Sequence, residues 1–165
     1  MNKERIKKIN SWILVIIWMI IIFMFSNMDT IKSNGTSKEM INKVVDTTIE
    51  TSNNIGIIEE TPTEEEKQNI VNNLNLPLRK IMHFTIYLFL SLLLLNALTK
   101  TKIQNKYFIT IIICFIYAIT DEYHQTFIDG RTGQFIDVLI DTTGSILGLI
   151  IYNKIIQKET KRDKK

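Results

Sequence analysis

Residues 81–99 read IMHFTIYLFLSLLLLNALT and contain no Asp, Glu, Lys or Arg. A second charge-free stretch, INSWILVIIWMIIIFMFSNM, covers residues 9–28. The hydrocarbon core of a bilayer is ~30 Å thick, so an α-helix needs about 20 mostly apolar residues to cross it. Charged residues flank both stretches. Each stretch therefore predicts a membrane-spanning helix rather than the core helix of a soluble protein.

The predicted helix at residues 9–28 is preceded by a basic segment, which is also typical of a cleaved secretory signal. Its Lys and Arg residues are Lys3, Arg5, Lys7 and Lys8. The residues that follow Phe25 are Ser-Asn-Met-Asp, and they offer no cleavage site of the small-x-small type. We therefore predict an uncleaved membrane anchor.

Two further apolar stretches contain acidic residues. Residues 107–120 are free of charge, and a helix there reaches spanning length only if it continues to Gln125. Residues 135–153 are apolar except for Asp137 and Asp141. We predict an all-α, polytopic membrane protein with four transmembrane helices and an extracellular two-helix loop between spans one and two. The predicted spans cover residues 9–27, 80–99, 105–125 and 134–153, within a membrane domain at 9–152.

The charges between the spans predict the orientation of the chain, because Lys and Arg concentrate on the cytoplasmic side. Three segments are rich in Lys and Arg: the leader at residues 1–8, the connection at 100–106 and the tail at 154–165. Residues 28–79 hold more acids than bases, and Arg131 is the only base in residues 121–134. We therefore expect a multi-pass protein of the cell membrane with both termini in the cytoplasm.

The formal net charge of +3 is explained by these membrane-flanking segments. A basic tail next to a membrane faces anionic lipid, so membrane lipids are the expected partners and no nucleic-acid partner is predicted.

The predicted outer loop, residues 28–79, contains two helical patterns and is too small to form a core of its own. Apolar residues recur at helical spacing over residues 38–51, and the preceding SNGTS at 33–37 predicts a turn. Residues 63–66, TEEE, form a capping box that starts the second helix, and Pro77 predicts its end. The apolar stripes fit three arrangements: on the membrane surface, against the outer ends of the spans, or against a partner.

The polar side chains of the predicted spans gather at their outer ends. Lys80, His83 and Tyr87 are spaced by three and four residues, so they share one face of the second span. Ionisable groups within a membrane span are costly and usually face the bundle interior or a wet cavity. The outer ends of all four spans are therefore expected to form one polar zone. Its candidate ligand-binding residues are Ser26, Lys80, His83, Tyr87, Asp121, Glu122, Gln125, Arg131, Asp137 and Asp141.

The fourth predicted span carries two acids and two glycines on one face. Asp137 and Asp141 are four residues apart, and Gly144 and Gly148 continue the same face. A Gly-x-x-x-Gly pair permits close approach between helices. We therefore expect this face to be buried against a neighbouring helix.

Three interpretations of the polar zone stay open. Its cations and carboxylates fit a structural network, or a site that binds a ligand or performs catalysis. Carboxylates with a histidine also have the donors for a divalent cation, but no ligand spacing such as His-Glu-x-x-His is present. We therefore predict no metal site and no cofactor. The sequence contains neither a nucleotide-binding loop nor a nucleophile elbow.

Several of these stretches resemble the VanZ-like family of small bacterial membrane proteins, over about residues 10–152. The resemblance rests on FS at 25–26, RKIMHFTIY at 79–87, DEYHQTFIDGR at 121–131 and DVLIDTTGSILG at 137–148. The family commonly has Pro where this chain has Asp129, and Asn where it has Asp141. The namesake protein is associated with low-level resistance to the glycopeptide teicoplanin. The resemblance implies a multi-pass protein of the cell envelope.

Three functions follow as hypotheses. Lys80, His83 and Arg131 could bind the head group of a lipid-linked cell-wall intermediate or of a lipoglycopeptide, since paired cations suit phosphate or carboxylate. An intramembrane enzyme would use His83 with Glu122 or Asp137 as an acid-base pair. A structural scaffold would use the polar zone only to hold the bundle together.

Overall fold

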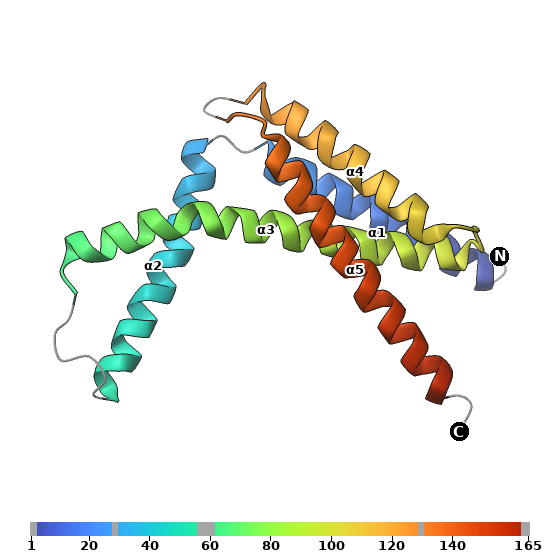
Figure 1. Ribbon diagram of the computed structural model, residues 1–165, viewed down its shortest axis with the longest axis horizontal. Helices are drawn as coiled ribbons and strands as arrows, with labels where there is room; N and C mark the ends of the chain where they lie inside the picture. Colours follow the sequence, from blue (N-terminus) through green and yellow to red (C-terminus); the bar gives the residue numbers. More distant parts are fainter. Residues whose placement is uncertain (1–2, 28–29, 56–61, 129–130, 163–165) are drawn as a thin grey trace.

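The computed structural model describes residues 3–27, 30–55, 62–128 and 131–162, and it places five helices and no strand within them. The helices are α1 (Lys3–Ser26), α2 (Thr30–Asn54), α3 (Glu64–Lys100), α4 (Lys106–Gln125) and α5 (Phe135–Arg162), shown in Figure 1. The predicted all-α class is confirmed for these residues.

Three of the described helices are long and apolar enough to cross a membrane: α1, α3 and the part of α5 up to Ile155. The fourth helix of the predicted bundle, α4, is 20 residues long, but its last two turns carry Asp121, Glu122 and His124. These polar residues lower its mean hydropathy. The count of membrane-competent helices in the described residues is therefore three.

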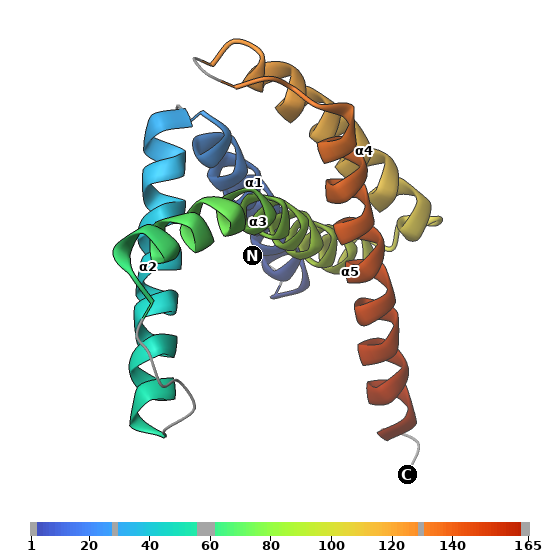
Figure 2. The ribbon, with the colours of Figure 1, turned by 60° about the vertical axis from the view of Figure 1, so that its left-hand side comes forward.

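Helix α3 is the centre of the molecule and contacts each of the other four helices. Figure 1 shows it running the length of the structure with α5 crossing it, and Figure 2 shows α2 and α5 on either side of it. The Trp18 indole of α1 donates to the Ile86 carbonyl of α3 at 3.0 Å. The Tyr117 hydroxyl of α4 donates to the Met19 carbonyl of α1 at 2.7 Å. These bonds satisfy polar groups in the interior of the bundle.

The glycine face of α5 packs directly on α3. A Cβ atom at Gly144 would meet the backbone carbonyl oxygen of Phe84, and one at Gly148 would meet the Ser91 side chain. The two helix backbones thus approach more closely than any larger residue permits. The prediction that this face is buried against a neighbouring helix is confirmed.

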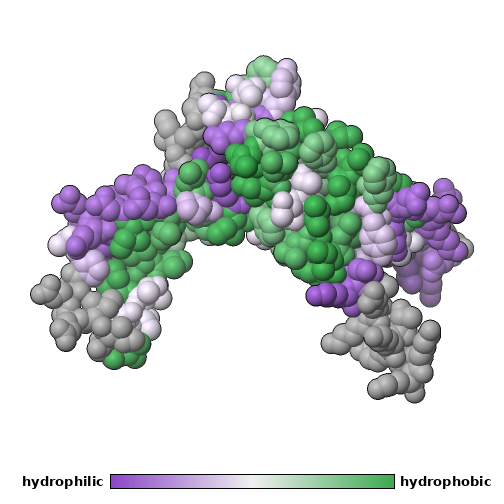
Figure 3. Space-filling view, in the orientation of Figure 1, coloured by the Kyte–Doolittle hydropathy of each residue, from purple (hydrophilic) through white to green (hydrophobic). Residues whose placement is uncertain are grey.

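The outer surface of the bundle is strongly apolar. Ile16, Ile20 and Met24 of α1 each expose about half or more of their surface. Figure 3 shows broad hydrophobic surface over α4 and α5, between hydrophilic patches near the start of α3 and near the N-terminus. Apolar surface of this extent is unusual for a soluble monomer and is typical of contact with lipid or a partner.

Two predictions about residues 28–79 are wrong. The SNGTS stretch at 33–37 is part of α2 rather than a turn, and α3 continues through Pro77 instead of ending there. Proline removes one helix hydrogen bond but need not end a helix that packing supports. Pro77 lies in an apolar groove where α2 crosses α3, and Leu74 and Leu78 on either side of it line the same groove. The capping box at Thr63 and Glu66 is confirmed.

Candidate functional site

A polar cavity of about 90 Å³ lies where α3, α4 and α5 meet the connection between α4 and α5. Five of the predicted site residues line it. They are Lys80, His83, Gln125, Arg131 and Asp137. The start of α5 and one face of α3 therefore both contribute to the cavity wall.

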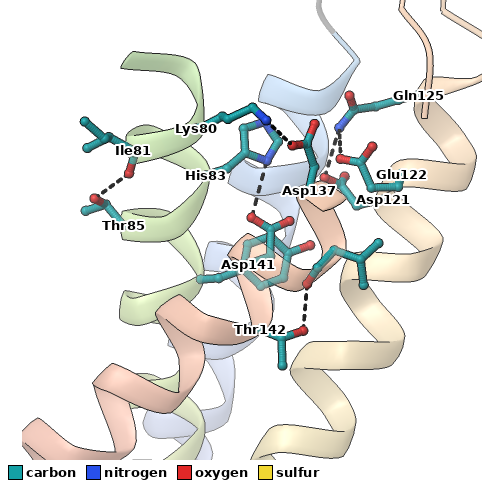
Figure 4. Close-up of polar contacts among 12 residues, drawn as sticks. Lys80, Ile81, His83, Thr85, Asp121, Glu122, Gln125, Asp137, Asp141 and Thr142 are labelled. Carbon is teal, nitrogen blue, oxygen red and sulfur yellow. Dashed lines mark hydrogen bonds and ion pairs between the residues drawn. The ribbon is translucent and has the colours of Figure 1, made fainter. Parts of the chain in front are cut away.

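Two contacts across the walls join α3 to α5. Lys80 Nζ lies 3.6 Å from Asp137 Oδ1, and His83 Nδ1 lies 3.6 Å from Asp141 Oδ1. The two pairs are one helical turn apart, because Lys80 and His83 are three residues apart on α3 and Asp137 and Asp141 are four residues apart on α5. Figure 4 shows the His83 ring directed toward Asp141, next to the Lys80–Asp137 pair. The helical spacing predicted in the sequence thus corresponds to paired faces in space.

Helix α4 contributes Gln125 to the cavity wall, and two buried carboxylates lie behind that residue. The Gln125 side-chain amide donates to Asp121 at 3.3 Å and to Glu122 at 3.1 Å. The backbone N–H of Gln134 donates to the second Glu122 oxygen at 3.0 Å. A Cβ atom at Gly133 would meet the Glu122 backbone oxygen, so the connection folds tightly onto the end of α4. These bonds hold both carboxylates toward the interior.

The deepest part of the site is closed to solvent. Asp141 and Tyr87 are each 0% exposed, and neither side chain makes a hydrogen bond among the described residues. Ser26 at the end of α1 is also buried and lies within interaction range of the Asp121 carboxyl. Arg131 is close enough to attract the Asp121 carboxyl electrostatically. Contacts or electrostatic attraction thus connect nine of the ten predicted site residues to another member of the set, and the buried Tyr87 hydroxyl makes no hydrogen bond to any of them.

The structure also adds residues that the predicted set did not include. Arg79, Thr132 and Gln134 line the cavity. Arg79 had a signal in the sequence, since it directly precedes Lys80 in one of the stretches that resemble the VanZ-like family. Gln134 bonds Glu122 through its backbone, a contact that no residue pattern reveals. Asp129 and Gly130 of the same motif lie outside the described residues.

His124 lies on a different face of α4 from the cavity residue Gln125 and contacts the end of α1 instead. Its ring stacks on Phe23 with centroids 4.7 Å apart, and Nε2 lies 3.3 Å from the Asn27 side-chain oxygen. It thus ties the end of α4 to the end of α1 and does not line the cavity.

Comparison with known proteins gives one match. The chain matches no curated protein and no solved structure. It does match the family described as VanZ/LLP1 over residues 11–157, which include all five helices in whole or in large part. That span contains every residue of the polar site, and it confirms the resemblance seen in the sequence. The chain belongs to the VanZ/LLP1 family.

Proposed function

We propose that the protein is a multi-pass component of the cell envelope in which α4 is the fourth membrane span. A helix of 20 residues rises about 30 Å, the thickness of a bilayer core. Helix α4 packs against α1, α3 and α5, all of which are apolar enough to span. Asp121, Glu122 and Gln125 in its last turns are buried in the bundle rather than exposed to lipid, which explains how a membrane span tolerates them.

The charges flanking the helices support an orientation with both termini in the cytoplasm. Lys and Arg are concentrated in the first turns of α1 and in and beside the connection between α3 and α4, while residues 28–79 are acidic overall. In this orientation the polar cavity opens near the outer face of the membrane. Helix α2 then lies on the outer side, next to the first half of α3.

The cavity is proposed to bind the anionic head group of an amphiphile. The observation that carries this proposal is the convergence of Arg79, Lys80 and Arg131 on one small cavity. Arginine and lysine form charge-assisted hydrogen bonds with phosphate and carboxylate oxygens, and these are about twice as strong as neutral ones. A cavity of about 90 Å³ accepts a phosphate or carboxylate but not a whole lipid-linked precursor.

The apolar part of the ligand has two surfaces available. The exposed apolar side chains of the bundle face lipid, and an apolar groove of about 240 Å³ lies between α2 and α3. The groove residues Leu74, Leu78 and Ile81 lie on the face of α3 opposite the cavity residues, so the lipid-facing side chains are the proposed surface for the tail of a ligand whose head group is in the cavity. A lipid-linked cell-wall intermediate or a lipoglycopeptide combines an anionic head with a hydrocarbon tail, and is the proposed ligand class.

The test is binding of polyprenyl phosphate to the full chain in nanodiscs, with uncharged polyprenol as the reference lipid. The wild type is expected to prefer the phosphate, and Arg131→Ala should weaken that preference by about tenfold or more. Lys67→Ala is the matched control, because Lys67 lies on α3 outside the cavity and pairs with Glu64 and Asp46. Equal binding of both lipids by the wild type, or unchanged binding by Arg131→Ala, would contradict the proposal.

An intramembrane enzyme is the second candidate, favoured by the position of His83 at the cavity wall. The contact that the structure gives His83 is to Asp141, while Glu122 and Asp137 lie within the same site. Turnover of a bound lipid that is lost in His83→Ala, with binding retained, would support catalysis. A purely structural role predicts instead that the variant Asp137→Asn with Arg131→Gln keeps full function.

A further inference from the structure

Four metal-ligating side chains form a cluster next to the polar cavity, and His83 is the one of the four that also lines the cavity. His83 of α3, Asp121 and Glu122 of α4, and Asp141 of α5 each offer one donor atom, and these four atoms lie within 4.8 Å of one another. We propose that these residues bind a divalent metal ion. The site is built from three helices, so it exists only in the folded bundle.

The spacing of the donors suits an ion. With metal–ligand bonds of about 2.1 Å, neighbouring ligands lie roughly 3 to 3.4 Å apart and opposite ligands roughly 4.2 Å apart. The His83–Asp141 distance of 3.6 Å is close to the first value. The widest separation of the four is within 4.8 Å, so closing around an ion requires movements of about half an ångström.

The donors also have unmet bonding capacity. Asp141 is 0% exposed, and neither of its carboxylate oxygens accepts a hydrogen bond from the described residues. His83 Nδ1 is likewise buried without a hydrogen bond, since 3.6 Å is too long for one. Figure 4 shows the Asp141 carboxylate directed toward His83. Buried polar groups are almost always satisfied, and a bound ion satisfies these together.

The charge balance of the cluster leads to the same inference. Three buried carboxylates this close together repel one another strongly unless positive charge is present. Arg131 attracts Asp121 electrostatically and offsets part of that charge, whereas Lys80 pairs with Asp137, which is not one of the four donors. A divalent cation among the four donors neutralises the remainder.

The donor set indicates the class of ion. Carboxylate oxygens suit Mg²⁺, Ca²⁺ and Mn²⁺, and an imidazole nitrogen suits Zn²⁺ and other transition metals. Three carboxylates with one histidine therefore favour Mn²⁺ or Zn²⁺ over Mg²⁺. The sequence alone predicted no metal site, because the ligands come from separate helices and form no local motif.

The proposal is tested by titrating Mn²⁺ into the full chain, purified in detergent with a chelator that is then removed. Electron paramagnetic resonance counts free Mn²⁺, and its electron-spin-echo modulation detects a coordinated histidine nitrogen. The wild type is expected to bind one ion and to show nitrogen modulation, which is lost in His83→Gln. Asp141→Asn should weaken binding by about tenfold or more, and Zn²⁺ should compete better than Mg²⁺.

Asp137→Asn is the matched control. It removes the same charge from the same helix one turn away, but it removes none of the four donors. Its Mn²⁺ affinity should stay closer to that of the wild type than to that of Asp141→Asn. Size-exclusion chromatography and circular dichroism exclude misfolding, and metal-dependent thermal stabilisation of the wild type provides a second readout. Absence of binding up to ~1 mM Mn²⁺ and Zn²⁺, or equal binding by Asp141→Asn, overturns the proposal.

Discussion

The imidazole Nδ1 of His83 lies 3.6 Å from Oδ1 of Asp141, a carboxylate with no exposed surface. This pair connects α3 to α5 in the interior of the bundle. One helical turn further along α5, Gly144 lies against the backbone of Phe84, the residue that follows His83. The polar pair and the glycine contact therefore depend on the same helix packing.

Breaking the His83–Asp141 pair should cost considerable stability in metal-free buffer. Removing one partner of a buried ion pair typically costs about 3–5 kcal/mol, because a charge is left buried alone. His83→Ala is therefore expected to lower the free energy of unfolding strongly, and Asp141→Asn less so. Tryptophan fluorescence during denaturation in detergent micelles measures both. The double variant should lose less free energy of unfolding than the two single variants lose together. Additive losses would show that the two side chains are not coupled.

Gly144→Ala should push α5 away from α3. The added Cβ meets a backbone oxygen that cannot rotate away, and overpacking of this kind costs about 1–3 kcal/mol. The control is Gly35→Ala in α2, where nothing lies within 4 Å of the added Cβ. That change should be neutral or stabilise α2 by up to about 1 kcal/mol, because alanine favours helix more than glycine. Thermal unfolding of both variants tests this contrast, and equal melting temperatures would contradict it.

The start of α3 should depend on pH. The backbone N–H of Thr63 donates to the Glu66 carboxylate at 2.9 Å, and this bond lowers the pKa of Glu66 below its usual value of 4.5. A lowered folded-state pKa means that the stabilisation is present at neutral pH and is lost as the pH falls through that pKa. Carbon chemical shifts of residues 63–67 in the micelle-bound chain should therefore move toward coil values only in acid.

The variant Glu66→Ala provides the check on this pH dependence. It should fray the helix start at neutral pH and remove the acid transition. Glu65→Gln should retain the transition, because Glu65 is not part of the capping box. A transition that persists in Glu66→Ala would assign it to another group.

Cysteine labelling should show that α4 crosses the membrane. The one native cysteine, Cys114, is fully buried and can be replaced by alanine. In that background, Thr132→Cys between α4 and α5 should react with a membrane-impermeant maleimide on intact cells. Gln104→Cys between α3 and α4 should react only after the cells are opened. Labelling of both positions from the same side would mean that α4 does not span.

Cells that express the protein should tolerate teicoplanin better if the cavity acts on envelope lipids or lipoglycopeptides. Minimal inhibitory concentrations are compared for wild type, Arg131→Ala and the control Lys67→Ala, at matched membrane levels. We expect the wild type and Lys67→Ala to raise tolerance by more than the doubling step of the assay, and Arg131→Ala not to. If the wild type does not raise the inhibitory concentration, the protein does not confer glycopeptide tolerance. The proposed lipid binding is then still tested by the nanodisc assay.

The sequence by itself determined the features that depend on neighbouring residues along the chain. Charge-free stretches located α1 and the second half of α3, and the capping box placed the start of α3. Helical spacing showed that Lys80 and His83 share a face, as Asp137 and Asp141 do. These properties follow from the 3.6-residue repeat of the helix and from the cost of charge in an apolar environment.

Only the tertiary structure decided which of these faces meet. The pairing of Lys80 with Asp137, and of His83 with Asp141, depends on the rotation and axial offset of α5 on α3, which the contact of Gly144 with Phe84 sets. The continuation of α3 through Pro77 likewise depends on packing against α2. Local patterns carry no information about such offsets, because they are set by contacts between residues far apart in the chain.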